Sequence, residues 1–505
     1  MTGFPWLSCI VFTPWAGALA LACLPRLGGT TVRVVGLVFS LSTLAFGLAV
    51  LAVFTPAAPG FQLVERETWI AALNVDYHLG LDGMSLLLVL LTGLVAPAAL
   101  LASWRLEREP RFLQVLFLLL QGSALGVFLA LDFFPWFIFW ELSLVPAYFL
   151  IKLWGGPGAA RAAHQFFIYT IGGSAFLLLG FAAIYAATGT LDFTQLAAGA
   201  LAGRLGGPWS TVVFLGVFLG LAVKVPLFPF HTWLPPAYAE APTGVAMFLT
   251  GVMSKMGVYG FIRILWPLFP GQLHAASGVL LWLALGGVVF GALAALAQTD
   301  LKRMVAYSSV NHVSYCLLAL FAVAGATGRA SGVAGPAAAA LDGALLQMFN
   351  HGVTAAALFF CVGVLEARAG GRRGLGDFGG VRAAAPVFAG LCGIALFASL
   401  GLPGLNGFIS EFLIFRGVFG LAPGMAAAAC LGLLVTAVFL LTFYQRVFHG
   451  PPAPTAKGFA DLKGLELAVL APAVAVMFLV GVLPQLVIGL INPLVTAWAG
   501  RLPLP

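Results

Sequence analysis

Residues 222–231 read Ala222-Val-Lys-Val-Pro-Leu-Phe-Pro-Phe-His231 and place a lysine and two prolines inside an apolar segment. A second stretch, Ser399-Leu-Gly-Leu-Pro-Gly-Leu-Asn-Gly-Phe-Ile-Ser-Glu411, interrupts another apolar segment and ends on a carboxylate. Proline removes a backbone donor and clashes with the preceding helical turn. In lipid, such a break persists only inside protein or beside a water-filled cavity. We therefore predict two broken transmembrane helices.

The composition around these stretches is that of a polytopic, all-α membrane protein. Of the 505 residues, 61% are hydrophobic and only 8% are charged, whereas soluble domains carry roughly 25% charged residues. The net charge of +7 could indicate a nucleic-acid partner, but the basic residues are scattered through loops and form no stripe. We therefore expect the chain to lie in a lipid bilayer and to bind no nucleic acid.

Fourteen apolar segments are long enough to span a bilayer, since a span needs about 20 residues. They cover residues 6–24, 32–54, 80–103, 112–131, 134–153, 163–187, 209–227, 243–266, 277–297, 304–325, 337–366, 386–420, 424–448 and 467–491. A further stretch, Leu191–Leu205, is weakly amphipathic and reads as an interfacial helix.

The two breaks fall in the seventh and twelfth segments, five apart. Such paired interruptions indicate inverted structural repeats with a site at each break. We place the repeats at helices 4–8 and 9–13. The predicted division is 1–111 (helices 1–3), 112–266 (first repeat), 277–448 (second repeat) and 449–505 (a loop and helix 14). The alternative is two unrelated proline kinks.

Basic residues in the loops predict the orientation. One set of loops holds sixteen of them: Arg26, Arg33, Arg105, Arg108, Arg111, Lys152, Arg161, Lys302, Arg303, Arg368, Arg372, Arg373, Arg382, Arg446, Lys457 and Lys463. The opposite set holds six: Arg66, Arg204, Arg263, Arg329, Arg416 and Arg501. The richer side should be cytoplasmic, which places both termini on the outer face.

Four charged residues lie within apolar segments: Glu141, Lys224, Lys255 and Glu411. A charge at the bilayer centre costs roughly 2.5–3.5 kcal/mol on insertion scales, and such residues commonly mark ion or proton pathways. Glu141 and Lys224 could form a pair that loads and unloads a proton as it closes and opens. The alternatives are a static ion pair and a lysine that reaches the interface.

Two histidines could continue such a pathway. His312 and His351 lie in the tenth and eleventh segments, and imidazole can accept a proton on one nitrogen and donate one from the other. The predicted relay passes from Lys224 to Lys255, through the histidines, to Glu411. A lone buried histidine is also often only hydrogen-bonded.

Other chemistry has little support in the sequence. The six cysteines lie in apolar runs with no CxxC pair, so no metal or iron–sulfur site is expected. No dinucleotide fingerprint, P-loop or nucleophile–base triad stands out. His78 looks peripheral, and Lys302 and Arg303 are expected to face the cytoplasm or lipid head groups.

Several motifs resemble those of a known family, the antiporter-like proton-translocating subunits of respiratory complex I (NADH:quinone oxidoreductase). They are Lys224-Val-Pro-Leu-Phe-Pro-Phe-His-Thr-Trp-Leu-Pro-Pro-Ala-Tyr-Ala-Glu-Ala-Pro-Thr243, Met253-Ser-Lys-Met-Gly-Val-Tyr-Gly260, Asp300-Leu-Lys-Arg-Met-Val-Ala-Tyr-Ser-Ser309 and Gly401-Leu-Pro-Gly-Leu-Asn-Gly-Phe-Ile-Ser-Glu-Phe412. L-type, N-type and Mrp chains of the family usually carry lysine in the twelfth helix. Glu411 makes the chain similar to the M-type members.

The resemblance implies a proton-translocating, non-redox subunit in a bacterial cytoplasmic membrane. NADH, FMN, iron–sulfur clusters and quinone would belong to partner subunits, and L-type and N-type chains would be neighbours. Glu141 and Lys224 would form the gating pair. The family commonly has Leu-Pro-Asp-Ala-His where this chain has Leu234-Pro-Pro-Ala-Tyr238, so Pro236 and Tyr238 remove an acidic and a basic group near the first break.

Other functions stay open on the sequence. The same fold serves Mrp-type cation/proton antiporters, bicarbonate-uptake subunits and membrane-bound hydrogenases. A purely structural or lipid-packing subunit is the remaining alternative. It predicts that neutralising Lys224 or Glu141 leaves transport unchanged.

Overall fold

The computed structural model describes every residue except 1–2, 25–26, 199–207, 328–331, 457 and 501–505. Within the described residues, twelve helical stretches are long and apolar enough to cross a membrane. They are α1 (Trp6–Cys23), α2 (Gly29–Val53), α3 (Gly83–Ala102), α4 (Pro110–Leu129), α5 (Phe133–Trp154), α6 (Ala159–Thr188), the stretch Thr243–Leu268, α13 (Pro270–Leu296), α14 (Leu301–Gly325), α15 (Ala334–Arg368), α19 (Pro423–Phe448) and α20 (Leu465–Val482).

The two predicted broken helices account for the remaining two spans. α8 (Pro208–Lys224) ends at its lysine, and the chain resumes as η3 (Phe230–Trp233) and α9 (Leu234–Glu240). α17 (Pro386–Leu400) and α18 (Asn406–Leu421) form the second broken helix. Gly401 caps α17 with φ +79, a left-handed conformation that glycine adopts without steric cost. The all-α membrane fold with broken seventh and twelfth helices is confirmed.

Two local features differ from the sequence prediction. The last segment is two helices, α20 and α21 (Gln485–Ala499), because Pro484 cannot donate to a helical bond. A small hairpin of antiparallel strands, β1 (Gln62–Ile70) and β2 (Val75–Leu81), precedes α3. Between these strands, Asn74 adopts φ +50, which asparagine tolerates better than most residues. Only α7 (Phe193–Ala197) is seen of the predicted interfacial helix, since 199–205 lie outside the described residues.

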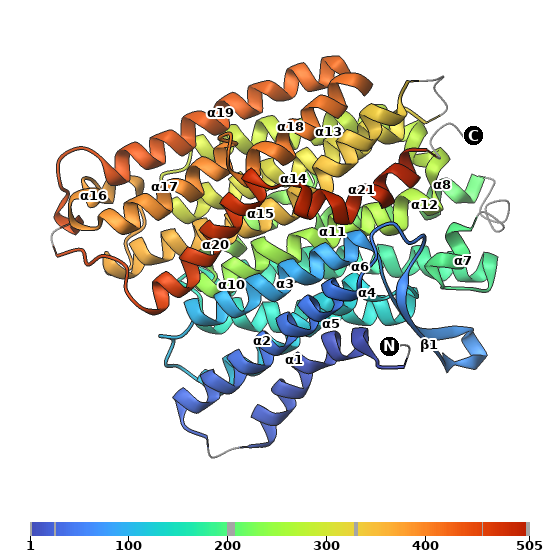
Figure 1. Ribbon diagram of the computed structural model, residues 1–505, viewed down its shortest axis with the longest axis horizontal. Helices are drawn as coiled ribbons and strands as arrows, with labels where there is room; N and C mark the ends of the chain where they lie inside the picture. The colour runs from blue at the N-terminus through green and yellow to red at the C-terminus, as the bar shows by residue number, and fades with distance from the viewer. Residues whose placement is uncertain (1–2, 25–26, 199–207, 328–331, 457, 501–505) are drawn as a thin grey trace.

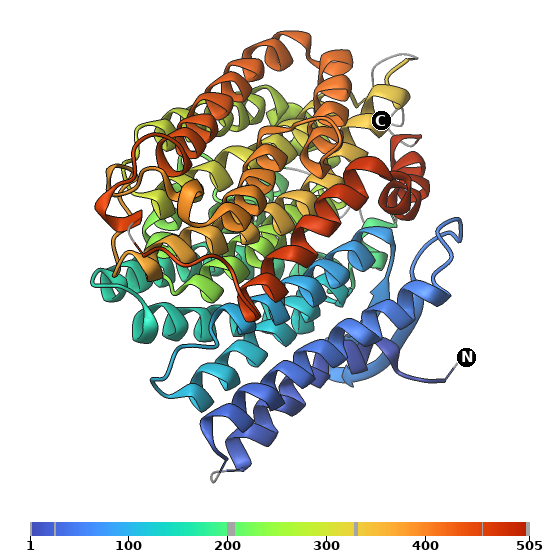
Figure 2. The same cartoon turned by 60° about the vertical axis from the view of Figure 1, so that its left-hand side comes forward.

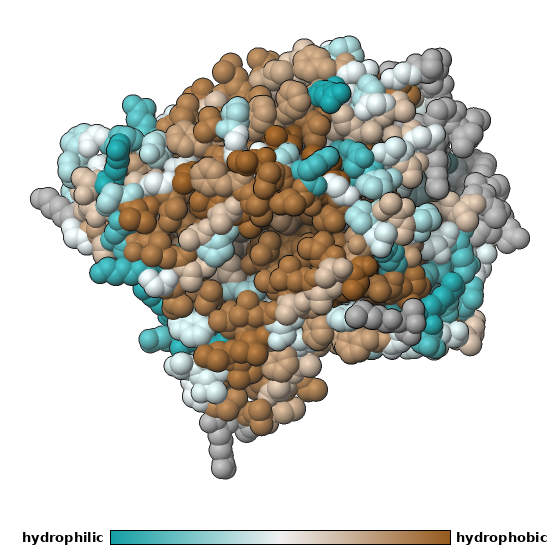
Figure 3. Space-filling model, in the orientation of Figure 1, coloured by the Kyte–Doolittle hydropathy of each residue, from teal (hydrophilic) through white to brown (hydrophobic). Residues whose placement is uncertain are grey.

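Central and peripheral helices differ in burial (Figures 1 and 2). The most apolar windows of Thr243–Leu268 and α15 are completely buried, and that of α14 is 94% buried. α2 lies at one edge and has only 28% of its window buried. Figure 3 shows apolar residues over the middle of one face and more hydrophilic residues toward the two ends of the helices. The central helices therefore isolate their polar side chains from lipid.

Both ends of the described chain lie at the end of the bundle that carries the hairpin (Figure 1). The Leu7 amide donates to Glu65 Oε1 of β1 at 2.7 Å. Trp498 of α21 packs edge-on against Trp266 of α12 (Trp266–Leu268), with ring centroids 6.0 Å apart. A chain with an even number of spans has both of its ends on the same side of the bundle.

Candidate proton-transfer site

Lys255 is a buried charge with several polar contacts. It lies on α11 (Ser254–Gly260), between the π-helical turns η4 (Leu249–Met253) and η5 (Phe261–Leu265). Its Nζ donates to the Thr250 carbonyl oxygen at 2.6 Å and lies 2.8 Å from His351 Nδ1 on α15. π turns shift the register of a helix and are frequent at functional sites. A proton can pass directly between Lys255 and His351.

His312 on α14 is held on both ring nitrogens. Nδ1 lies 3.1 Å from Glu411 Oε1 on α18, and Nε2 lies 3.1 Å from Ser399 Oγ at the end of α17. Gln347 Nε2 is 3.5 Å from both His312 Nδ1 and Glu411 Oε1. His312 therefore joins the centre of the bundle to both halves of the second broken helix.

The two histidine rings are neighbours without a hydrogen bond. Their centroids are 5.4 Å apart, with the planes inclined by 34°. The gap between Lys255, His312 and His351 has no room for a water molecule. The residues from Lys255 to Glu411 thus form a nearly continuous, dry line of titratable groups, which we call the central relay.

At the first broken helix, the buried charges are not in contact with each other. Lys224 Nζ lies 4.9 Å from the Trp140 ring centroid and 3.5 Å from Ser143 Oγ, both on α5. No ion pair within 4.0 Å joins Lys224 to Glu141, which lies between those two residues in sequence. Glu141 Oε1 is buried and has no hydrogen-bond partner among the described residues. The predicted pairing of Glu141 with Lys224 is not formed in this conformation.

Gly257 brings Lys255 close to the first break. A Cβ at this position would lie 2.7 Å from the Val225 backbone nitrogen, closer than side-chain carbons pack. Glycine therefore lets α11 touch the chain where α8 ends. Within the described part of the chain, no side-chain hydrogen bond connects Lys224 with Lys255.

Sequence reasoning missed the polar residues that support the relay. Thr250 Oγ1 and Ser309 Oγ are 2.9 Å apart, and Tyr238 donates its hydroxyl to the Leu249 carbonyl oxygen at 3.0 Å. The signal was present, because Gln347 precedes His351 by four residues and Ser309 precedes His312 by three. Those spacings put each pair on one helix face.

Lys302 does not face the cytoplasm or lipid head groups as predicted. Its side chain is buried, and its Nζ lies 2.6 Å from Glu366 Oε2 on α15 and 3.3 Å from the Ala241 carbonyl oxygen. A lysine at the start of α14 can reach across to α15 because the helices pack side by side. Arg303 is exposed, as expected.

His78 is not peripheral either. It is buried in a cluster outside the spans, where its Nδ1 lies 2.8 Å from Asp192 Oδ2. Arg66 bridges Asp76 at 2.7 Å and Asp192 at 3.2 Å. Burial would raise the pKa of Asp192, but hydrogen bonds from His78, Thr194 and the next amide lower it to about 2. Burial raises the pKa of Asp132, just before α5, to about 6.

The described residues contain no group of three or more His, Cys, Asp or Glu side chains that could hold a metal ion.

The family profile described as NADH:quinone oxidoreductase/Mrp antiporter, TM, matches residues 130–437. That range contains both broken helices and all six predicted relay residues. The chain belongs to this family.

Named relatives are similar over nearly their whole length. The chain is 35% identical to NADH-quinone oxidoreductase subunit M of Mycobacterium tuberculosis, over 98% of this chain and 94% of that protein. It is 37% identical to the Rhodobacter capsulatus protein with the same name, over 96% and 95%. It also superimposes on a chain of respiratory complex I from Thermus thermophilus with a TM-score of 0.84 and 31% identity, covering 98% and 99% of the two chains.

Proposed function

We propose that this chain is a proton-translocating, non-redox membrane subunit of an NADH:quinone oxidoreductase. The observation that carries the proposal is the central relay, in which Lys255, His351, His312 and Glu411 line up inside the bundle. The similarity to M-type subunits over almost the full length supports the same assignment. NADH, FMN, the iron–sulfur clusters and quinone belong, on this proposal, to partner subunits.

The relay residues have distinct roles. Lys255 holds a proton at Nζ and passes it to His351 Nδ1, which lies 2.8 Å away. His312 receives it from His351 once one ring turns or the dry gap admits a water, and then delivers it to Glu411. Ser399 and Gln347 hold the His312 ring and orient it toward Glu411.

Lys224 and Glu141 control the relay by charge. When the pair is open, the positive charge of Lys224 is uncompensated and disfavours a proton on Lys255. When Glu141 approaches, it neutralises Lys224 and allows Lys255 to reload. Quinone reduction in partner subunits would drive the pair between these states. The open pair is the state in which a proton moves from Lys255 toward Glu411.

The membrane placement follows from the same proposal. The chain is a multi-pass protein, and we infer a bacterial cytoplasmic membrane with both termini on the outer face. L-type and N-type chains would be its neighbours. We also propose that the two repeats, 112–266 and 277–448, are functional halves of the chain, each with one broken helix.

A cation/proton antiporter, bicarbonate-uptake or hydrogenase subunit is the second candidate, because the family also includes Mrp antiporters. A hard cation such as sodium takes several oxygen ligands. The first break offers Glu141 and Ser143 beside a lysine, which is poor ligation for a cation. Protons are therefore favoured.

The test uses the assembled complex in sealed vesicles, with proton uptake and NADH:quinone activity measured together. Lys224→Ala and Glu411→Gln should abolish pumping and strongly slow coupled turnover. The matched controls are Lys152→Ala and Glu67→Gln, which neutralise exposed charges. If pumping survives in both Lys224→Ala and Glu411→Gln, the buried charges are structural and the proposal is wrong. Sodium-dependent transport would support the antiporter candidate instead.

A further inference from the structure

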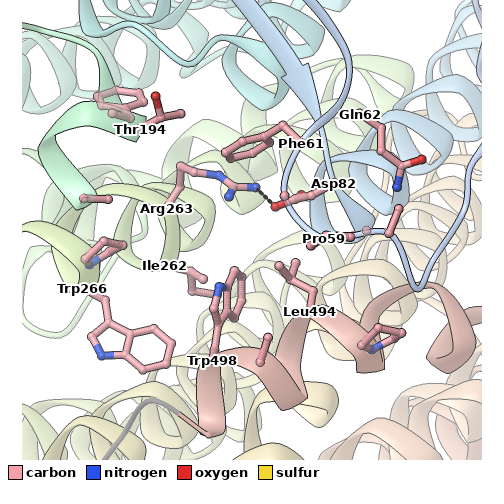
Figure 4. Close-up of a pocket in the computed structure, with 18 of the residues that line it drawn as sticks. Pro59, Phe61, Gln62, Asp82, Thr194, Ile262, Arg263, Trp266, Leu494 and Trp498 are labelled. Atoms are coloured by element: carbon pink, nitrogen blue, oxygen red, sulfur yellow. Dashed lines mark hydrogen bonds and ion pairs between the residues drawn. The ribbon is translucent and has the colours of Figure 1, made fainter. Parts of the chain in front are cut away.

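A second polar site lies far from the central relay, in a pocket of about 810 Å³ at the hairpin end of the bundle (Figure 4). Its walls come from the loop before β1, the start of α3, α7, η5, α12 and α21. Ligand pockets typically enclose about 300–1,000 Å³. The described residues therefore form a cavity within the size range of ligand pockets.

Arg263 is the charged group of this pocket, and its side chain is 8% exposed. Its Nη2 donates to Asp82 Oδ2 at 2.6 Å, and its Nε donates to the Tyr259 hydroxyl at 3.2 Å. Nη1 makes no hydrogen bond to any described residue, and it is not among the buried atoms without a partner. Figure 4 shows the guanidinium beside Asp82 at the edge of the cavity. Arg263 thus keeps donors available for a ligand.

The rest of the lining is apolar and aromatic. Trp266, Trp498, Leu494 and Ile262 form the side opposite the ion pair (Figure 4). The two tryptophans meet edge to face, with centroids 6.0 Å apart. The pocket is therefore amphipathic, with one charged end and one apolar wall.

Its depth in the membrane points to the class of ligand. Every wall is an end of a spanning helix or a connection at that end, which is the level of lipid head groups. Tryptophan is enriched at this level, and a guanidinium at this level can meet a lipid phosphate. Arginine also recognises phosphate better than a point charge does, because its donors form a planar fork.

We propose that this pocket binds one phospholipid, with the phosphate on Arg263 and an acyl chain against Trp266, Leu494 and Trp498. The Arg263–Asp82 pair presents a cation and a carboxylate side by side. That arrangement matches a zwitterionic head group, since Asp82 can accept from an ammonium while Arg263 donates to the phosphate. Phosphatidylethanolamine fits this pattern better than an anionic lipid, whose net charge would meet the Asp82 carboxylate.

Ala497→Trp tests the pocket without touching the ion pair. Ala497 lines the cavity and is exposed, so an indole at this position fills space that the lipid would use. Thr496→Trp on the same helix is the matched control, because Thr496 is exposed and does not line the cavity. Arg263→Lys keeps a cation for Asp82 but removes the spare donor.

The assay is the thermal stability of the delipidated complex in detergent as phosphatidylethanolamine, phosphatidylcholine, phosphatidylglycerol or ubiquinone is added. Ligand that binds only the folded state raises Tm in a concentration-dependent way. We expect phosphatidylethanolamine to act at the lowest concentration, Ala497→Trp to abolish that part of the shift, and Thr496→Trp to preserve it. Arg263→Lys should need about tenfold more lipid, as expected for losing one charge-assisted hydrogen bond.

Two results would overturn the assignment. If Ala497→Trp and Thr496→Trp respond to lipid as wild type does, the pocket holds no lipid. If ubiquinone gives the pocket-dependent shift and phospholipids do not, the occupant is a quinone. Neither result bears on proton pumping by the central relay, so the two proposals can fail independently.

Discussion

Replacing His312 by glutamine should stop proton transfer through the chain while preserving the fold. Glutamine occupies a similar volume and can still hydrogen-bond to Ser399 or Glu411, but it does not titrate. His351 and Glu411 would then have no titratable group between them. The native side chains there leave no room for a water molecule, so no water is in place to take over from the lost ring.

The size of the effect follows from the contacts. His312 touches Glu411 at 3.1 Å and Ser399 at 3.1 Å, and glutamine can restore only part of this pattern. A lost hydrogen bond to a charged group costs about 1.5–3 kcal/mol, which is tolerable in a large assembly. Loss of a positioned acid–base group slows a proton transfer by about 10²–10⁴-fold. Pumping should therefore fall far more than stability.

His312→Ala provides the discriminating comparison. Alanine leaves a polar cavity beside Glu411 and Gln347, and a polar cavity of this kind can hold water or imidazole. Proton uptake by vesicles that contain the complex should be almost absent in both variants. Added imidazole should restore part of it in His312→Ala and none in His312→Gln. Equal rescue of both variants, or normal pumping by His312→Gln, would refute the relay through His312.

Three further predictions test other parts of the molecule. Because the pKa of Asp132 is raised to about 6, its desolvation costs the folded state up to about 3 kcal/mol at pH 7 and little below pH 4. Asp132→Asn should therefore raise Tm by an amount that grows from pH 4 to pH 7. Asp192→Asn should instead lower Tm at pH 7. If the change in Tm for Asp132→Asn does not vary with pH, the burial of Asp132 is not the cause. Gly407→Ala places a Cβ against the Ala398 carbonyl oxygen. This overpacking should cost about 1–3 kcal/mol of stability, which native gels would show as reduced assembly. Normal assembly would mean that α17 and α18 separate freely. Lys302→Met leaves Glu366 with only Arg373, at 3.5 Å, as an ion-pair partner among the described residues. The substitution should lower stability by about 2 kcal/mol. The double variant Lys302→Met with Glu366→Gln should recover much of the lost Tm, and no recovery would mean that the two residues are not coupled.

Local chemistry explains why the broken helices could be predicted from the sequence. Proline and glycine act on their own backbone, so Pro226 and Gly401 mark the breaks without reference to the rest of the fold. Buried lysines and glutamates are recognisable for a similar reason, because a charge in an apolar segment is costly wherever its partner lies. The relay prediction added the two buried histidines, His312 and His351, to these charges because imidazole can both accept and donate a proton.

The contacts could not be predicted in the same way. Lys255 meets His351 across 96 positions and His312 meets Glu411 across 99, which only tertiary packing decides. Lys302 looked like a surface residue because Glu366, its partner on α15, lies 64 positions away. The hairpin was missed because its alternating charged and apolar residues resemble a polar connection between membrane spans.

The open state of the Glu141–Lys224 pair bears on how such a chain avoids leaking protons. A continuous line of titratable groups across the membrane would let protons run back down the gradient. Here the line is closed from Lys255 to Glu411, apart from the one ring-to-ring step, and open between Lys224 and Lys255. The open part lies beside the first break, where α8 ends at Lys224 and Pro226 interrupts the helix. On the proposed mechanism, this interruption is what lets Lys224 alternate between Glu141 and the relay. The second break is held by Ser399, Asn406 and Ser410 through hydrogen bonds to α14 and α15. The two broken helices would therefore divide the work, with the first acting as the moving gate and the second as a fixed end of the relay.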